Sequence, residues 1–100
     1  MMNSPYTLLT LESLNHIARG SVSFSQHLRD GGIGYRVGYP NGYSASIIKL
    51  PYSYGNEDDL WEVAVLWNDS LCYDTPITDD VCGYLTEEEV IAVCDQIYRL

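Results

Sequence analysis

Adjacent acidic side chains are the first feature of this sequence that could carry chemistry. Three clusters occur, at Glu57–Asp59, Asp79–Asp80 and Glu87–Glu89. Neighbouring carboxylates can hold a hard cation, but none of these clusters has the D-x-D-x-D-G…E order of a calcium loop. Acids are also favoured at helix N-termini and in solvated loops. We interpret the three clusters as acids of solvated loops and of a helix start, and we expect no metal ion and no other cofactor.

Histidine and cysteine are the other candidates for catalysis. His16 or His27 could serve as a base for a nucleophile at Cys72 or Cys82, and such partners meet only in the folded chain. A small hydrolase of this kind would need a pocket that joins a histidine to a cysteine. No GxSxG, HExxH or P-loop motif is present. Three cysteines without CxxC spacing also argue against disulfides and structural zinc. We predict that the protein is not an enzyme and that Cys94 is a small core residue.

Length and composition indicate one globular domain that spans residues 1–100. The chain is 46% hydrophobic, and nine of its twelve aromatic residues are tyrosine, a residue enriched at protein interfaces. No basic region followed by an apolar run marks a signal peptide, and no segment approaches the roughly 20 apolar residues of a membrane span. We expect a protein of the host cytoplasm that does not bind membranes.

The charge is strongly uneven along the chain. Residues 1–56 contain four basic and two acidic residues, a net charge of +2. Residues 57–100 contain twelve acids and one base, Arg99, a net charge of −11. An acidic face would repel nucleic acid and attract a basic protein surface. Simple solubility is the alternative explanation for the acidic excess.

Helical patterns occur at both ends of the chain. Ser4–Pro5 is a favourable helix start, and Gly20 is a natural stop. Between them, apolar residues recur at helical spacing: Leu8, Leu11, Leu14, Ile17 and Ala18. This predicts a helix over Pro5–Arg19. Thr86 and Glu89 have the spacing of a capping box and predict a second helix to about Arg99, with its apolar face at Val90, Val93, Cys94 and Ile97.

The middle of the chain predicts strands. Residues 33–39 alternate apolar side chains with Gly34, Arg36 and Gly38, so either something approaches this backbone closely or the strand is weak. Asn41–Gly42 predicts a type I′ hairpin turn to a partner strand over residues 43–50. Residues 60–67 form an apolar run typical of a central strand covered on both faces. Residues 71–73 can return as a short fourth strand. Residues 21–30 fit either a strand or a helical turn.

These elements predict an α+β fold in which an antiparallel sheet of three to four strands packs against the N-terminal and C-terminal helices. Residues 51–59 and 74–84 are expected to be loops. Four tyrosines are interleaved with the acids of the second half: Tyr52, Tyr54, Tyr73 and Tyr84.

The second half of the chain also resembles a known group of proteins. The segments NGYSASIIKLPYSYG, LWEVAVLW and YDTPITDDVCGYLTEEEV are similar to a family of small, mostly uncharacterised proteins encoded in phage and prophage genomes. The resemblance covers roughly Tyr39 to Leu100. It implies a phage or mobile-element setting, in which small acidic proteins often inhibit host defences.

Together these observations suggest an inhibitor of a host defence complex. We expect an anti-CRISPR protein that binds a basic, nucleic-acid-handling surface of a Cas effector and does not itself bind nucleic acid. The expected partner-binding residues are Tyr52, Tyr54, Glu57, Asp58, Asp59, Trp67, Asp69, Asp74, Asp79 and Asp80. The alternative is a phage accessory protein that acts as a regulatory or homo-oligomeric module, for example a homodimer, through the exposed face of residues 60–67 or the tyrosines.

Overall fold

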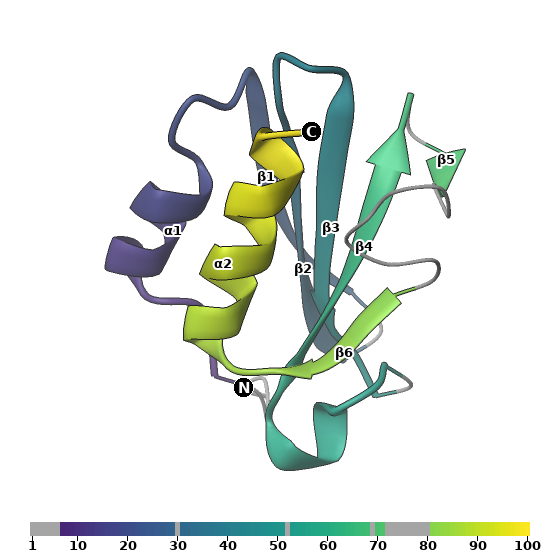
Figure 1. The fold of residues 1–100 in the computed structure, drawn as a ribbon. Coiled ribbons are helices and arrows are strands. Elements are labelled where there is room, and N and C mark those ends of the chain that lie inside the picture. The colour runs from purple at the N-terminus through teal and green to yellow at the C-terminus, as the bar shows by residue number, and fades with distance from the viewer. Residues whose placement is uncertain (1–6, 30, 52, 69, 72–80) are drawn as a thin grey trace.

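The protein folds into one antiparallel sheet with two helices on one face (Figure 1). The computed structural model describes residues 7–29, 31–51, 53–68, 70–71 and 81–100. The elements in chain order are α1 (Leu11–Ile17), β1 (Ser23–Arg29), β2 (Gly32–Gly38), β3 (Tyr43–Lys49), η1 (Asn56–Asp58), β4 (Trp61–Trp67), β5 (Ser70–Leu71), β6 (Val81–Leu85) and α2 (Glu87–Tyr98).

The predicted α+β class is confirmed, but the sheet is larger than predicted. Strands β1, β2, β3 and β4 follow one another as antiparallel neighbours, and β5 and β6 both pair with β4. The described chain therefore has six strands instead of three to four. The additional strands are β1, which resolves the ambiguous residues 21–30, and β6, whose residues were predicted to be part of a loop.

Apolar side chains on one face of β2 and β3 build the core. Ile33, Tyr35 and Val37 of β2 are buried, as are Ala45 and Ile47 of β3, which confirms the predicted alternation. Strand β4 is buried on both of its faces from Val63 to Leu66, as expected for a central strand. Among the described residues, no helix is long and apolar enough to cross a membrane.

The hairpin between β2 and β3 has a different turn from the one predicted. A type I′ turn needs positive φ at both Asn41 and Gly42, but only Gly42 has it, at 90°. The Tyr39 amide donates to the Tyr43 carbonyl, and the Gly42 amide donates to the Tyr39 carbonyl. The loop therefore has three residues and ends on a glycine. The Asn41 side chain stabilises this three-residue loop, because it accepts from the Tyr43 amide and donates to the Ile97 carbonyl at the end of α2.

The first helix is shorter than predicted and buries only part of the predicted apolar stripe. Ser4 and Pro5 lie outside the described residues, and the helix begins after Thr10, whose hydroxyl accepts from the Ser13 amide. Leu11 is 80% exposed, whereas Ser13 and Ile17 are buried. The predicted stripe is therefore confirmed at Ile17, which is buried, and at Leu14, which packs against the core, but it was wrong at Leu11. Ser13 is buried in its place because its hydroxyl donates to Glu87 of α2.

The C-terminal helix agrees with its prediction. Thr86 and Glu89 form the capping box reciprocally, with the Thr86 amide donating to Glu89 and the Glu89 amide donating to Thr86. Val90, Cys94 and Ile97 are buried against the sheet. The helix therefore closes the core over β3 and β4.

Close approach explains the glycines of β2. A Cβ on Gly34 would lie 2.8 Å from His27 Nε2, and a Cβ on Gly38 would collide with the Ser23 hydroxyl. Both of these side chains belong to the neighbouring strand β1, so the glycines make room for the polar face of β1 on the side of the sheet away from the core.

Candidate functional site: a tyrosine and acid patch

Three of the predicted partner-binding residues lie together at one end of the sheet. Tyr54, Glu57 and Asp58 line a pocket of about 200 Å³, together with Ser53, Gly55 and Tyr84. We call Tyr54, Glu57, Asp58 and Tyr84 the tyrosine–acid patch. Five predicted residues lie outside the described residues: Tyr52, Asp69, Asp74, Asp79 and Asp80.

Backbone contacts between two distant segments build this patch. The Gly55 carbonyl accepts hydrogen bonds from the amides of Asp58 and Leu60, which folds η1 into a compact turn. A Cβ on Gly55 would lie 2.9 Å from the Tyr84 Cα, so the turn packs directly on the end of β6. The Tyr84 amide also faces the Tyr54 carbonyl at 3.4 Å. The two tyrosines are therefore held side by side by the backbone.

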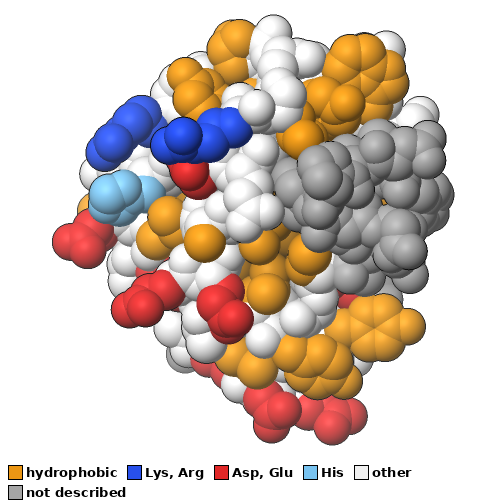
Figure 2. Space-filling model, viewed as in Figure 1, with side chains coloured by type: hydrophobic (Ala, Val, Ile, Leu, Met, Phe, Trp, Pro, Cys, Tyr) orange, Lys and Arg blue, Asp and Glu red, His pale blue; other side chains and the backbone are white. Residues whose placement is uncertain are grey.

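Two exposed rings and two exposed carboxylates make up the surface of the patch. Tyr54 and Tyr84 are 61% and 59% exposed. Glu57 and Asp58 are also exposed, and no cation among the described residues pairs with either. Figure 2 shows hydrophobic and acidic side chains next to one another at the lower end of the molecule. Such a surface can pair its carboxylates with Lys or Arg and pack its rings against their side chains.

Asp59 follows Glu57 and Asp58 in the sequence but points to different partners. Its carboxylate lies 2.9 Å from the Lys49 ammonium and accepts from the Thr7 amide at 3.1 Å. Partial burial raises the pKa of Asp59, but the hydrogen bonds from Lys49 and Thr7 and the Lys49 charge outweigh it and lower the pKa overall. Asp59 therefore contributes to the fold, and its charge is already neutralised.

Trp67 is not part of the patch. It ends β4, and its ring lies 4.8 Å from the Tyr43 ring, centre to centre. The other end of β4, at Trp61, is about 20 Å away at the rise of a strand. Trp67 and the tyrosine–acid patch are therefore separate surfaces.

Most other acids that the structure describes also have partners within the fold. Glu87 of α2 accepts from the amide and hydroxyl of Thr10 and from the Ser13 hydroxyl, which ties α2 to the start of α1. Glu62 accepts from the Tyr54 amide, and Asp95 pairs with Arg99. Much of the described acidic charge therefore stabilises the structure, which leaves Glu57 and Asp58 as the unpaired acids of the patch.

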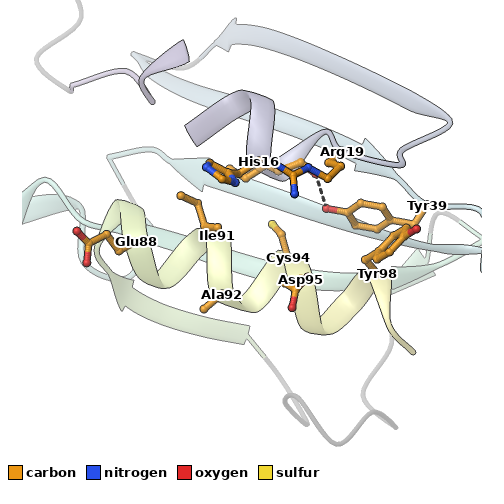
Figure 3. Close-up of a pocket in the computed structure, with 10 residues that line it drawn as sticks. His16, Arg19, Tyr39, Glu88, Ile91, Ala92, Cys94, Asp95 and Tyr98 are labelled. Atoms are coloured by element: carbon orange, nitrogen blue, oxygen red, sulfur yellow. Dashed lines mark hydrogen bonds between the residues drawn. The ribbon is translucent and has the colours of Figure 1, made fainter. Parts of the chain in front are cut away.

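A second pocket lies between the two helices (Figure 3). It is relevant to the alternative of a small hydrolase, which would need a pocket that joins a histidine to a cysteine. It has a volume of about 340 Å³ and is lined by both His16 and Cys94. Burial raises the pKa of the Cys94 thiol to about 12. A thiol with this pKa is almost wholly protonated at neutral pH and is a poor nucleophile. The prediction of Cys94 as a core residue is confirmed, because it is buried in the hydrophobic core.

Tyr84 belongs to the patch, and although it was one of the four interleaved tyrosines, it was not in the expected set of partner-binding residues. Its region was expected to be a loop, whereas residues 81–85 form β6 and pair with β4. Tyr84 has a φ of 58°, a backbone conformation that is rare for a bulky residue. The neighbouring Gly83 was the one sequence feature that could have indicated this close contact. A Cβ there would lie 2.6 Å from the Tyr54 Cβ.

Comparisons of this chain with protein-family models, with curated proteins and with solved structures find no match.

Proposed function

We propose that this chain is a non-enzymatic inhibitor that binds a basic protein surface through its tyrosine–acid patch. The observation that carries the proposal is the position of Glu57 and Asp58 beside the exposed rings of Tyr54 and Tyr84. Both carboxylates are exposed, and no cation in the described part of the chain pairs with them. In this proposal the carboxylates take the place of phosphates on the partner's basic surface, and the rings take the place of bases.

The partner in this proposal is a nucleic-acid-handling protein of a host defence system. The resemblance of residues 39–100 to phage-encoded proteins supports this setting, and a CRISPR–Cas effector is the partner that we propose. The chain then acts in the host cytoplasm and blocks the access of guide RNA or target DNA. Asp59 and Trp67 are left out of the contact set, because Asp59 is paired with Lys49 and Trp67 packs on Tyr43.

Inhibition of purified Cas effectors tests this function. Effectors of several types, with and without guide RNA, are mixed with the chain, and guide loading and target-DNA binding are measured by mobility shift. We expect at least one effector to be blocked by the wild-type chain. The variant E57K/D58K should lose inhibition, because it reverses both unpaired carboxylates of the patch.

A matched control variant makes the same change in net charge at a different part of the surface. The variant E12K/E88K reverses two other exposed acids, one on each helix, and neither lines the patch pocket. It should inhibit as well as the wild type. Equal inhibition by E57K/D58K and the wild type would disprove the role of the patch, and a panel without any inhibited effector would disprove the partner class.

A further inference from the structure

Strand β1 is an open edge of the sheet. Among the residues that the structure describes, it lies at the end of the strand order and pairs with β2 alone, over all seven of its residues. Arg29 pairs with Gly32, and residues paired across so short a separation in sequence form a hydrogen-bonded pair. The backbone groups of alternate residues therefore point outward, at Phe24, Gln26 and Leu28. These groups are a template for another strand.

The side chains of this edge are also unprotected. The described side chains of β1, residues 23–28, are all exposed, and they include Phe24 and Leu28 on one face. Edge strands are commonly guarded against pairing by charged residues or proline. The strand contains no proline and no acid, and its one charged residue, Arg29, is at its end.

The sequence of β1 is complementary to itself when it is reversed. Gln26 lies at the middle, with Phe24 two residues before it and Leu28 two residues after it. In an antiparallel pair of β1 strands centred on Gln26, Phe24 of each copy lies opposite Leu28 of the other. The face that these side chains share also holds Tyr35, whose ring lies 6.1 Å from that of Phe24. Apolar cross-strand pairs of this kind stabilise a sheet.

Charge favours the same edge. The chain has a net charge of −9, so two copies repel each other over most orientations. Strand β1 contains one base and no acid, so contact along it places no acid of one β1 strand against the other. A second copy of this chain is therefore the occupant that matches both the pattern and the charge of the edge.

We propose that two copies of this chain associate through their β1 strands, antiparallel and centred on Gln26, into one continuous sheet. The arrangement has two-fold symmetry, with the same patch used by both copies. It is independent of the tyrosine–acid patch, which lies on the turn and strand formed by η1 and β6.

Charges placed at the two-fold axis test this arrangement. In Q26K or Q26E homodimers, like charges would face each other across the axis, whereas an equal mixture of the two variants would place opposite charges there. Sedimentation velocity should show wild-type dimers, weaker association of each variant alone by roughly tenfold, and recovery in the mixture. Gln26 is exposed, so thermal melting should show both variants folded.

Amide exchange gives a readout without mutation. The outward amides of Phe24, Gln26 and Leu28 should exchange fast in dilute protein and slow down as the concentration rises. A wild-type chain that is monomeric at its highest soluble concentration would overturn the proposal. So would dimers of Q26K and Q26E as stable as the wild type, because the axis would then lie elsewhere.

Discussion

The Lys49 ammonium lies 2.9 Å from the Asp59 carboxylate and 4.1 Å from the centre of the Trp61 ring. Lys49 is 1% exposed, although it is a lysine on the core face of β3. A buried ammonium needs a counter-charge and hydrogen-bond acceptors, and Asp59 and the Thr7 carbonyl supply them. This relationship divides the acidic run Glu57–Asp59 into two exposed acids that can meet a partner and one that holds the fold.

Removing the Asp59 charge should destabilise the protein. Asparagine keeps the size of the side chain and tolerates the positive φ of 59° at this position, so D59N isolates the loss of charge beside Lys49. Because Asp59 is itself 45% exposed, we expect a loss of about 2 kcal/mol in the free energy of unfolding, less than for a fully buried pair. Urea denaturation measures it. The neighbouring variant D58N should stay within about 0.5 kcal/mol of the wild type, and an equal loss in both variants would contradict this role.

Stability should fall in acid, in part through Glu87. Partial burial raises the pKa of Glu87, but hydrogen bonds from Ser13 and Thr10 outweigh it and hold the pKa below its ordinary value of 4.5. A carboxyl whose pKa is lowered by folding stabilises the folded state above its unfolded pKa. This contribution is lost as the pH falls through the lower, folded pKa. Asp59 adds a contribution of the same sign.

Urea midpoints measured from pH 7 down to pH 3 test this dependence. The wild type should be nearly constant above pH 5 and lose stability below about pH 4.5. The variant E87Q should be less stable at pH 7 and should lose less on acidification, because glutamine does not titrate. Parallel pH profiles for the two proteins would show that Glu87 does not contribute.

Two glycines of β2 should respond differently to the same substitution. A Cβ on Gly32 would lie 2.7 Å from the Leu50 Cα, which is backbone and cannot move away. A Cβ on Gly34 would meet the end of the exposed His27 side chain, which can rotate. We expect G32A to lose about 3 kcal/mol and G34A to lose less than about 1 kcal/mol. Thermal and urea unfolding of the two variants give the comparison, and an equal loss would contradict the assigned contacts.

The Cys94 thiol should react only when the protein unfolds. In the variant C72S/C82S it is the one remaining cysteine, and it is buried with its pKa raised to about 12. Labelling by a thiol reagent at pH 8 should therefore be slow and should accelerate with urea in step with global unfolding. Fast labelling of the folded protein would show an accessible thiolate and would contradict the burial of Cys94.

The elements that could be predicted from the sequence are those with their own local signal. The alternation of β2 and β3, the apolar run of β4 and the capping box of α2 each lie within a short stretch. Strand β1 gives only an ambiguous signal, which also fits a helical turn, because all of its described side chains are exposed. Strand β6 is short and pairs with β4 through an irregular register near Val63, so its pattern does not differ from that of a loop.

The candidate site could be predicted only in part for a similar reason. Tyr54, Glu57 and Asp58 are close in sequence, and the same turn holds them together. Tyr84 joins them through backbone packing on Gly55, a contact between segments that are far apart in the chain. The pairing of Asp59 with Lys49 is equally a property of the fold, and Asp59 does not differ in type from its exposed neighbour Asp58.

The most direct test of the central claim is the association rate with an inhibited Cas effector, measured against ionic strength. Surface plasmon resonance would compare the wild type, E57K/D58K and the control E12K/E88K. The tyrosine–acid patch predicts that the rate of the wild type and of the control falls steeply with salt. It predicts that E57K/D58K binds roughly tenfold more slowly at low salt, with a flatter dependence. Equal rates and equal salt dependence for E57K/D58K and the wild type would contradict the claim.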